Sequence, residues 1–205
     1  MSAAPLGEPP AVLANDRSLP VSGVNPSELV RVSRFVTGEP HFGASGANRF
    51  DAPGCVGGTP EYRTCYFGSG LDVAIAESLL HDAIPIDGCF LIASSTLRQR
   101  YVHYFDGNPL RLLDLTGALL KRLDGHADLA GTGDYPVTQR WALAVFKNPL
   151  RFDGFIYMSR HLNTGRAVVL FDRAAARLKH LSVITVLCDA PGFVEAAKAF
   201  FITPA

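Results

Sequence analysis

Five side chains of this sequence suit nucleotide binding and sugar chemistry: Arg31, Arg49, Tyr66, Glu77 and Ser159. An arginine binds phosphate through paired N–H groups, and a tyrosine offers an aromatic face and a hydroxyl to a ring and its ribose. A carboxylate accepts a ribose hydroxyl and stabilises positive charge that develops on the sugar. The set predicts cleavage of a glycosidic bond in a nucleotide through an oxocarbenium-like state, by analogy with glycoside hydrolysis. A serine hydrolase is not supported, because no Gly-x-Ser-x-Gly turn surrounds Ser159.

The stretch at residues 65–81 must position two of these side chains. It predicts a short buried strand, a Gly-Ser-Gly turn and a helix that is apolar nearly all round. Ser69 and Asp72 have the spacing of a capping box, which predicts a helix start near Leu71. Glu77 lies inside the apolar run, where a carboxylate is either paired or used. A structural ion pair and a functional carboxylate both remain open at this stage.

The two arginines lie on an expected strand and an expected loop. Residues 29–36 predict a strand, in which Arg31 and Arg34 point to opposite faces because their separation is odd. The alternative is an edge strand with two solvated arginines. Residues 38–60 predict a long loop, and Arg49 within it presents its guanidinium to an anion or is a plain surface arginine. The loop contains no dinucleotide-binding or Walker-type pattern.

The remaining pattern indicates an α+β fold, because strands and helices do not alternate steadily. Residues 1–26, rich in Ala and Pro, predict an arm on the surface or on a partner, with a helical turn near 11–15. The other expected strands are 88–93, 110–116, 153–160, 166–171 and 183–188, and the other expected helices are 117–123, 137–147 and 193–201.

Composition limits the class of protein. A chain of 205 residues with 48% hydrophobic and 19% charged residues is expected to fold as one globular domain. Nineteen basic and nineteen acidic residues cancel, which argues against direct nucleic-acid binding. The four cysteines and six histidines lack metal-ligand spacing, so no metal is expected. Without a signal-peptide pattern or a run of about twenty apolar residues, a cytoplasmic protein with no membrane contact is expected.

Seven short segments occur in order between residues 29 and 171. Together they resemble the RES-domain proteins, a family named for an Arg, a Glu and a Ser. The segments are Leu29-Val30-Arg31-Val32, Asn48-Arg49-Phe50-Asp51-Ala52-Pro53-Gly54, Gly58-Thr59-Pro60, Cys65-Tyr66-Phe67-Gly68, Ala74-Ile75-Ala76-Glu77-Ser78-Leu79, Asp153-Gly154-Phe155-Ile156-Tyr157-Met158-Ser159-Arg160 and Ala167-Val168-Val169-Leu170-Phe171.

The resemblance implies a fold and a reaction. The fold is an α+β domain similar to diphtheria-type ADP-ribosyltransferases, with a mixed split sheet and peripheral helices. It would span residues 27–205 behind the 1–26 arm. The reaction is NAD degradation at the nicotinamide–ribose bond, by phosphorolysis or hydrolysis. NAD is then a substrate, inorganic phosphate a candidate co-substrate, and no cofactor is needed. ADP-ribosylation of a protein target and a catalytically inactive partner-binding module are the alternatives.

The same resemblance implies partners and residue roles. Family members are often bacterial toxins whose cognate antitoxin blocks the active site. Arg31 and Arg49 would hold the NAD pyrophosphate or the incoming phosphate, and Tyr66 would pack on the nicotinamide or its ribose. Glu77 would bind the ribose hydroxyls and stabilise the oxocarbenium, while Ser159 would orient Glu77 or the substrate.

The sequence departs from the family pattern in two places near the site. Asn48-Arg49-Phe50 stands where Gly-Arg-Trp is usual, and residues 54–65 are longer and richer in glycine than expected. Both departures bear on the shape of the pocket, and therefore on substrate preference more than on chemistry.

Overall fold

The structure is a computed structural model that describes residues 5–181, 183 and 185–205, and its main element is a curled sheet. Over these residues the sheet has nine strands, and only β6 and β7 pair in parallel. This mixed sheet confirms the α+β fold expected from the sequence. The strand order is β1 (Ser22–Val24), β6 (Leu110–Asp114), β7 (Gly154–Met158), β8 (Arg166–Phe171), β3 (Thr64–Gly68), β2 (Val30–Ser33), β5 (Tyr101–Gly107) and β10 (Thr185–Val186), with β9 (Leu178–His180) paired to β5.

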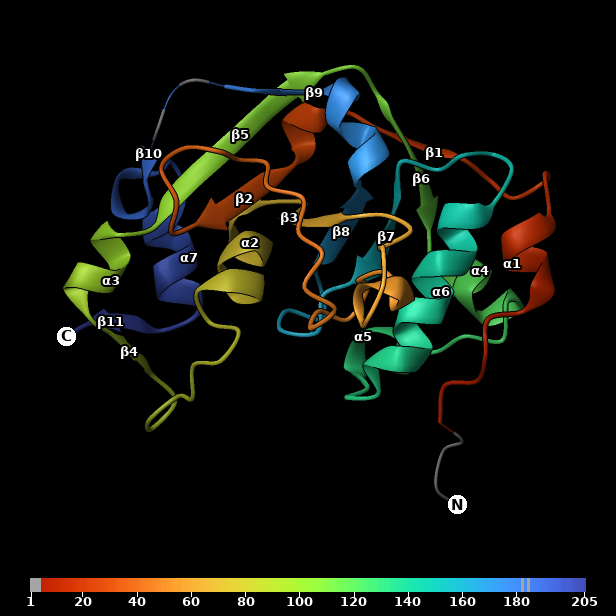
Figure 1. Cartoon of the computed structure of the whole chain (residues 1–205). Helices are drawn as coiled ribbons and strands as arrows, with labels where there is room; N and C mark the ends of the chain where they lie inside the picture. The colour runs from red at the N-terminus through yellow and green to blue at the C-terminus, as the bar shows by residue number, and fades with distance from the viewer. Residues whose placement is uncertain (1–4, 182, 184) are drawn as a thin grey trace.

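Two groups of helices lie under this curled sheet, and the 38–60 loop, drawn in orange, passes between them (Figure 1). On one side are α2 (Leu71–Ser78), α3 (Ser94–Arg98) and α7 (Phe193–Ala199), with a small parallel sheet of β4 (Phe90–Ile92) and β11 (Ile202–Pro204). On the other side are α1 (Ala11–Asn15), α4 (Gly117–Arg122), α5 (Asp128–Gly131) and α6 (Tyr135–Lys147). None of the described helices is long and apolar enough to cross a membrane.

Strand alternation decides which side chains face the space between the helices. In β3, Cys65 and Phe67 join one hydrophobic cluster, whereas Tyr66 packs against the cluster on the opposite face. In β7, Ile156 joins the cluster of Cys65, and Tyr157 joins that of Tyr66. Successive side chains of a strand point to opposite faces, so the two tyrosines share one face.

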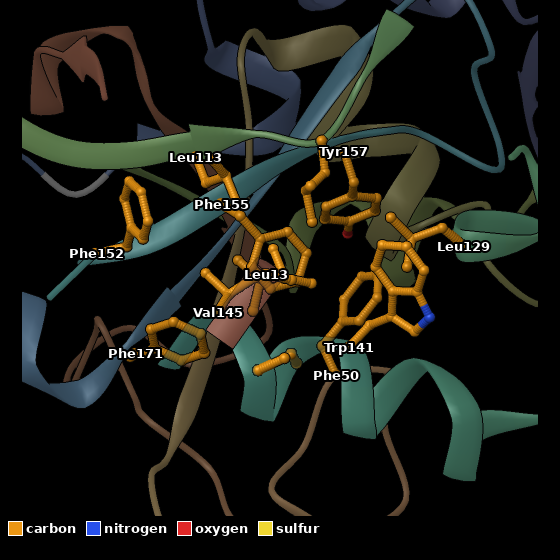
Figure 2. Packing of buried hydrophobic residues seen from close by; sticks show 14 of the residues in the cluster. Leu13, Phe50, Leu113, Leu129, Trp141, Val145, Phe152, Phe155, Tyr157 and Phe171 are labelled. Carbon is orange, nitrogen blue, oxygen red and sulfur yellow. The ribbon is translucent and has the colours of Figure 1, made fainter. Parts of the chain in front are cut away.

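Phe50 fixes the middle of the long loop to this face. Its ring is fully buried and lies 4.9 Å from the Phe155 ring and 4.9 Å from the Tyr157 ring, both in edge-on contact. Figure 2 shows these rings in the same cluster as Leu13 and Trp141. Burying a phenylalanine ring stabilises the fold by about 1.5–3 kcal/mol. The loop is therefore held to the core at the residue that follows Arg49.

The expected start of the central helix is confirmed, because α2 begins at Leu71. The predicted capping box is wrong. The Ser69 hydroxyl donates to the Arg166 carbonyl oxygen at 2.7 Å, and Asp72 Oδ1 accepts from the adjacent Val73 N–H at 2.8 Å. Because Ser69 binds the neighbouring strand, α2 begins with no side-chain cap.

The N-terminal segment packs against the rest of the domain. The expected helical turn is α1, which lies against α6, and β1 lengthens the sheet by pairing with β6. The Trp141 Nε1 group donates to the Gly7 carbonyl oxygen at 2.9 Å, and Leu13 is fully buried. Where an arm ends and a catalytic domain begins stays a prediction.

The other expected elements are present with shifted ends. Strands β4, β6, β7 and β8 and helices α4, α6 and α7 lie where the pattern placed them. The expected strand at 183–188 is shorter: β10 covers only Thr185–Val186, a 3-10 turn follows at Leu187–Asp189, and residue 184 lies outside the described residues. Strands β1, β5, β9 and β11 and helices α3 and α5 were not predicted from the sequence.

Candidate functional site

One cleft of about 380 Å³ gathers most of the sequence-predicted site residues. Arg31 comes from β2, Arg49 from the long loop, Tyr66 from β3 and Glu77 from α2. Ser159 does not line the cleft, but it is buried directly beside Glu77. The sequence did not single out the other functional side chains of the lining, which are His41, His81, Tyr135, Tyr157, Arg160 and His161.

Glu77 is held by neutral donors. Its Oε1 accepts from the Ser159 hydroxyl at 2.5 Å and from the Arg160 backbone N–H at 3.1 Å, and its Oε2 lies 3.5 Å from the Tyr157 hydroxyl. Among the described residues no basic side chain lies within 4.0 Å of its oxygens. The structural ion pair considered from the sequence is therefore wrong. The carboxylate is oriented without being neutralised, as stabilisation of a developing positive charge requires.

Ser159 is fixed by the turn after β7. Its backbone N–H donates to the Gly165 carbonyl oxygen at 3.0 Å, and its hydroxyl oxygen accepts from the Leu162 N–H at 3.0 Å. Only 1% of its surface is exposed. With its oxygen occupied by Leu162, the hydroxyl proton is directed to Glu77. Ser159 is thus placed to orient the carboxylate rather than to contact a ligand.

Arg31 is tied down by two acceptors. Its Nε pairs with Glu39 Oε2 at 2.6 Å, and its Nη1 donates to the Tyr66 carbonyl oxygen at 3.0 Å. The Arg31 side chain is 23% exposed, and that of Glu39 only 1%. Since β2 lies between β3 and β5, the edge-strand alternative is wrong. Arg31 lines the cleft, but because its Nε is engaged by Glu39 it has no free Nε–Nη2 fork with which to clamp a phosphate.

Glu39 was not identified from the sequence. Burial opposes its ionisation, but the hydrogen bond and charge of Arg31 outweigh that effect and hold the pKa of Glu39 below its usual value. The His41 backbone N–H also donates to Glu39 Oε2 at 2.8 Å, whereas Oε1 has no partner among the described residues. Glu39 precedes a proline in an irregular loop, so no sequence pattern marked it as the partner of Arg31.

Arg49 lines the cleft, and side chains of α6 hold its part of the loop in place. The Thr138 hydroxyl donates to the Arg49 carbonyl oxygen at 2.6 Å, and the Gln139 amide donates to the Asn48 carbonyl oxygen at 3.0 Å. The Arg49 guanidinium lies over the Tyr135 ring, 4.9 Å from its centre, and Nη1 donates to the Thr132 carbonyl oxygen. Burial lowers the pKa of Arg49. The plain surface arginine considered from the sequence is wrong.

Tyr66 and Tyr157 supply neutral phenols. Burial raises the pKa of both hydroxyl groups, and nearby Asp51 adds to the effect at Tyr66 and Glu77 at Tyr157. The Tyr66 oxygen accepts from the Phe50 N–H at 3.1 Å. Neither phenol ionises near neutral pH, so each acts as a hydrogen-bond donor and a packing surface and not as a base.

The rim of the cleft adds a cation and two imidazoles. Arg160 follows Ser159 directly, and its guanidinium lines the cleft with no carboxylate partner in the described part of the chain. The rings of His81 and His161 lie 4.6 Å apart, and burial lowers the pKa of His161. Arg160 could have been identified from the sequence as a site residue, because it follows Ser159 directly. The imidazole pair could not have been, because its members lie eighty residues apart.

The cleft is built from charge and aromatic groups and not from metal ligands. Across residues 5–181, 183 and 185–205, no group of three or more His, Cys, Asp or Glu side chains is placed to hold a metal ion. One acid with neutral donors, three guanidinium groups and two phenols can bind an anionic ligand and stabilise a cation at its centre.

This combination defines a class of protein, an α+β domain with an acid-and-arginine cleft at the end of β7. The RES domain family model matches residues 28–189, and the chain belongs to that family. A chain of the crystal structure of the M. tuberculosis MbcT–MbcA toxin–antitoxin complex is similar in fold, with a TM-score of 0.55 and 15% sequence identity. The similarity covers 86% of this chain and 90% of that one. No curated protein sequence matches this chain significantly.

Proposed function

We propose that this protein is an NAD-degrading enzyme that cleaves the nicotinamide–ribose bond. The observation that carries the proposal is the state of Glu77, a carboxylate oriented by Ser159, Tyr157 and the Arg160 N–H but not paired with any cation among the described residues. Such a group stabilises positive charge on a ribose more strongly than one already in an ion pair. The cleft volume, about 380 Å³, lies within the range of small-molecule sites.

Each side chain of the cleft has a separate role in this reaction. The bond between the ribose anomeric carbon and the nicotinamide nitrogen breaks, and its electron pair leaves with neutral nicotinamide. Glu77 faces the oxocarbenium that forms and accepts hydrogen bonds from the ribose hydroxyls. Arg49 and Arg160 bind the pyrophosphate, with a single contact from Arg31. The oxygen of water or of inorganic phosphate then bonds to the anomeric carbon, and the water or phosphate proton passes to solvent.

We further propose that the protein acts as a cytoplasmic toxin and that a cognate antitoxin covers this cleft. Membership in the RES family and the fold shared with a chain of a toxin–antitoxin complex support this role. NAD is the substrate, phosphate the candidate co-substrate, and neither a resident cofactor nor direct nucleic-acid contact is needed. The formal net charge of zero agrees with the last point.

The test is NAD consumption by the purified chain with and without inorganic phosphate, with mass analysis of the products. Free nicotinamide with ADP-ribose identifies hydrolysis, and a product one phosphate heavier identifies phosphorolysis. Glu77→Gln keeps the shape of the side chain and removes its charge, so we expect turnover to fall at least about 100-fold with little change in the thermal midpoint. Glu195→Gln, at an exposed carboxylate on α7, is the matched control and is expected to be fully active.

Two results would contradict the proposal. Folded wild-type protein that leaves NAD intact would exclude NAD degradation, and transfer of ADP-ribose to an added protein would then identify a transferase. Unfolding of Glu77→Gln would assign the carboxylate a structural role.

A further inference from the structure

A second charged hollow lies at the opposite end of β7 from Ser159. Its volume is about 640 Å³, and we call it the arginine hollow. Its floor is near Asp153, six residues before Ser159, which places the two sites roughly 20 Å apart along the strand. The lining consists of Asn108, Arg111, Leu150, Arg151, Asp153, Arg173, Ala176 and Arg177.

Charge is concentrated in this hollow although the chain as a whole is neutral. Four of the nineteen basic residues line it, and only one of the nineteen acidic residues does. The excess of positive charge is therefore local. Asp172 lies close enough to Arg173 to favour its charged form, but it does not line the hollow.

Two of the arginines are held in place by a buried carboxylate and by backbone oxygens. Asp153 is 4% exposed, and its Oδ2 forms an ion pair with the Arg177 Nε at 3.1 Å and accepts a hydrogen bond from the Arg111 backbone N–H at 2.8 Å. Arg177 Nη1 donates to the Pro109 carbonyl oxygen at 3.3 Å, and Arg111 Nη2 donates to the Leu150 carbonyl oxygen at 3.2 Å. These contacts orient the guanidinium groups before any ligand arrives, which lowers the entropy cost of binding.

The other two arginines complete the wall. Arg173 lies 3.7 Å above the centre of the Phe146 ring and donates to the Phe146 carbonyl oxygen at 3.1 Å. Burial lowers the pKa of Arg173, and the charge of Arg151 lowers it further, so the two guanidinium groups repel each other. The Arg151 side chain is exposed and has no hydrogen-bond or ion-pair partner among the described residues. A bound anion would relieve this repulsion.

We propose that the arginine hollow binds a compact anion that carries several phosphate groups. Guanidinium groups from β6, from the loop before β7 and from the 3-10 turn Asp172–Arg177 line one concavity. Arg151, which has no partner among the described residues, can contact a phosphate through paired N–H groups, and the other three offer the N–H groups that their protein contacts leave free. No aromatic ring of the described part of the chain lines the hollow to stack a nucleic-acid base. Among the described residues, only Leu150 and Ala176 give the lining apolar surface, so it offers little to anchor an acidic peptide.

The experiment is calorimetric titration of the full chain with sodium tripolyphosphate at low salt. Because the cleft also offers arginines to phosphate, the titration is made in the Glu77→Gln/Arg49→Gln background. We expect one binding event there and at least about tenfold weaker binding when Arg111→Gln/Arg151→Gln is added, because two charge-assisted contacts are lost. Arg17→Gln/Arg98→Gln, added to the same background, removes the same charge from two exposed arginines elsewhere and is expected to leave binding unchanged. Arg111→Lys/Arg151→Lys keeps the charge without the planar fork and is expected to bind with intermediate affinity.

The arms of the experiment separate this site from the cleft and from other anions. Tripolyphosphate must still bind to Glu77→Gln/Arg49→Gln, in which the cleft is altered. NAD turnover must be unchanged in Arg111→Gln/Arg151→Gln, in which the hollow is altered. The hollow therefore stands or falls independently of the proposed NAD reaction. Equal loss of affinity in the double variant and its control would overturn the proposal, as would tighter binding of an acidic peptide or a DNA duplex than of tripolyphosphate. Should the double variant not fold, Arg151→Gln alone is expected to weaken binding, and unchanged affinity would refute the site.

Discussion

Replacing Ser159 by alanine tests how Glu77 is oriented. The substitution removes the 2.5 Å hydrogen bond to Glu77 Oε1 and leaves the Arg160 N–H and the Tyr157 hydroxyl in place. A hydrogen bond to a charged group contributes about 1.5–3 kcal/mol. If that interaction acts fully in the transition state, kcat falls about 10- to 150-fold while KM stays nearly constant. The loss is smaller than in Glu77→Gln because two donors remain.

The assay is steady-state NAD consumption, with the thermal midpoint measured on the same samples. Ser18→Ala is the matched control, since the Ser18 hydroxyl also donates to a carboxylate, Asp16 Oδ1 at 2.8 Å, on an exposed part of the N-terminal segment. We expect full activity from this control. Unchanged kcat in Ser159→Ala would refute the role of the hydroxyl. A loss of activity that follows only the fraction of unfolded protein would show that Ser159 acts on the fold alone.

Two further predictions concern groups behind the cleft. Glu39→Gln leaves the partly buried Arg31 without its counter-charge and is expected to reduce the free energy of unfolding by about 1–3 kcal/mol, measured by urea titration. Glu8→Gln, which breaks the exposed Arg140 pair, is expected to cost about 0–1 kcal/mol, and equal costs would refute the argument. Burial also lowers the pKa of His103 below 6.5, so the unfolded chain binds its proton more readily. The contribution of neutral His103 to the free energy of unfolding is therefore fully present above about pH 6.5. It is lost as the pH falls through the lower pKa of the folded state. His103→Gln is expected to flatten the thermal midpoint between pH 7 and pH 5, and an unchanged slope would contradict this.

Local pattern predicted the elements that carry the site. The apolar run around Glu77 predicted α2, the Ser69–Asp72 spacing predicted a start near Leu71, and short continuous apolar runs predicted β7 and β8. These segments are apolar runs whose ends are marked by glycines or polar turns. The family resemblance was confirmed as well, because it rested on an ordered set of such segments.

Strand β5 and the packing of the N-terminal segment depend on tertiary contacts that local sequence patterns do not reveal. The sequence analysis passed over β5 because it carries His103, Tyr104 and Asp106 among its apolar residues, and only pairing with β2, β9 and β10 makes it a central strand. The N-terminal segment was predicted to be an arm rich in Ala and Pro, yet its helix α1 packs against α6 and Leu13 is fully buried. Burial of a few side chains against a distant helix leaves no periodic signal in such a short segment.

The same limit applied within the site. Residue types identified Arg31 and Glu77 as candidates, but the sequence left open whether Glu77 pairs with an arginine. That question depends on which acceptor each arginine meets in space. The partner of Arg31 is eight residues away, and that of Arg49 eighty-three residues away.

The availability of Glu77 follows from how the arginines around it are engaged. Arg31 is paired with Glu39, and Arg49 donates to the Thr132 carbonyl oxygen and lies over Tyr135. Arg160 contacts Glu77 through its backbone N–H and not through its guanidinium. None of these three guanidinium groups forms an ion pair with Glu77. The positive charge of Arg49 and Arg160 remains for an anionic ligand, and the negative charge of Glu77 remains for a cation formed between them.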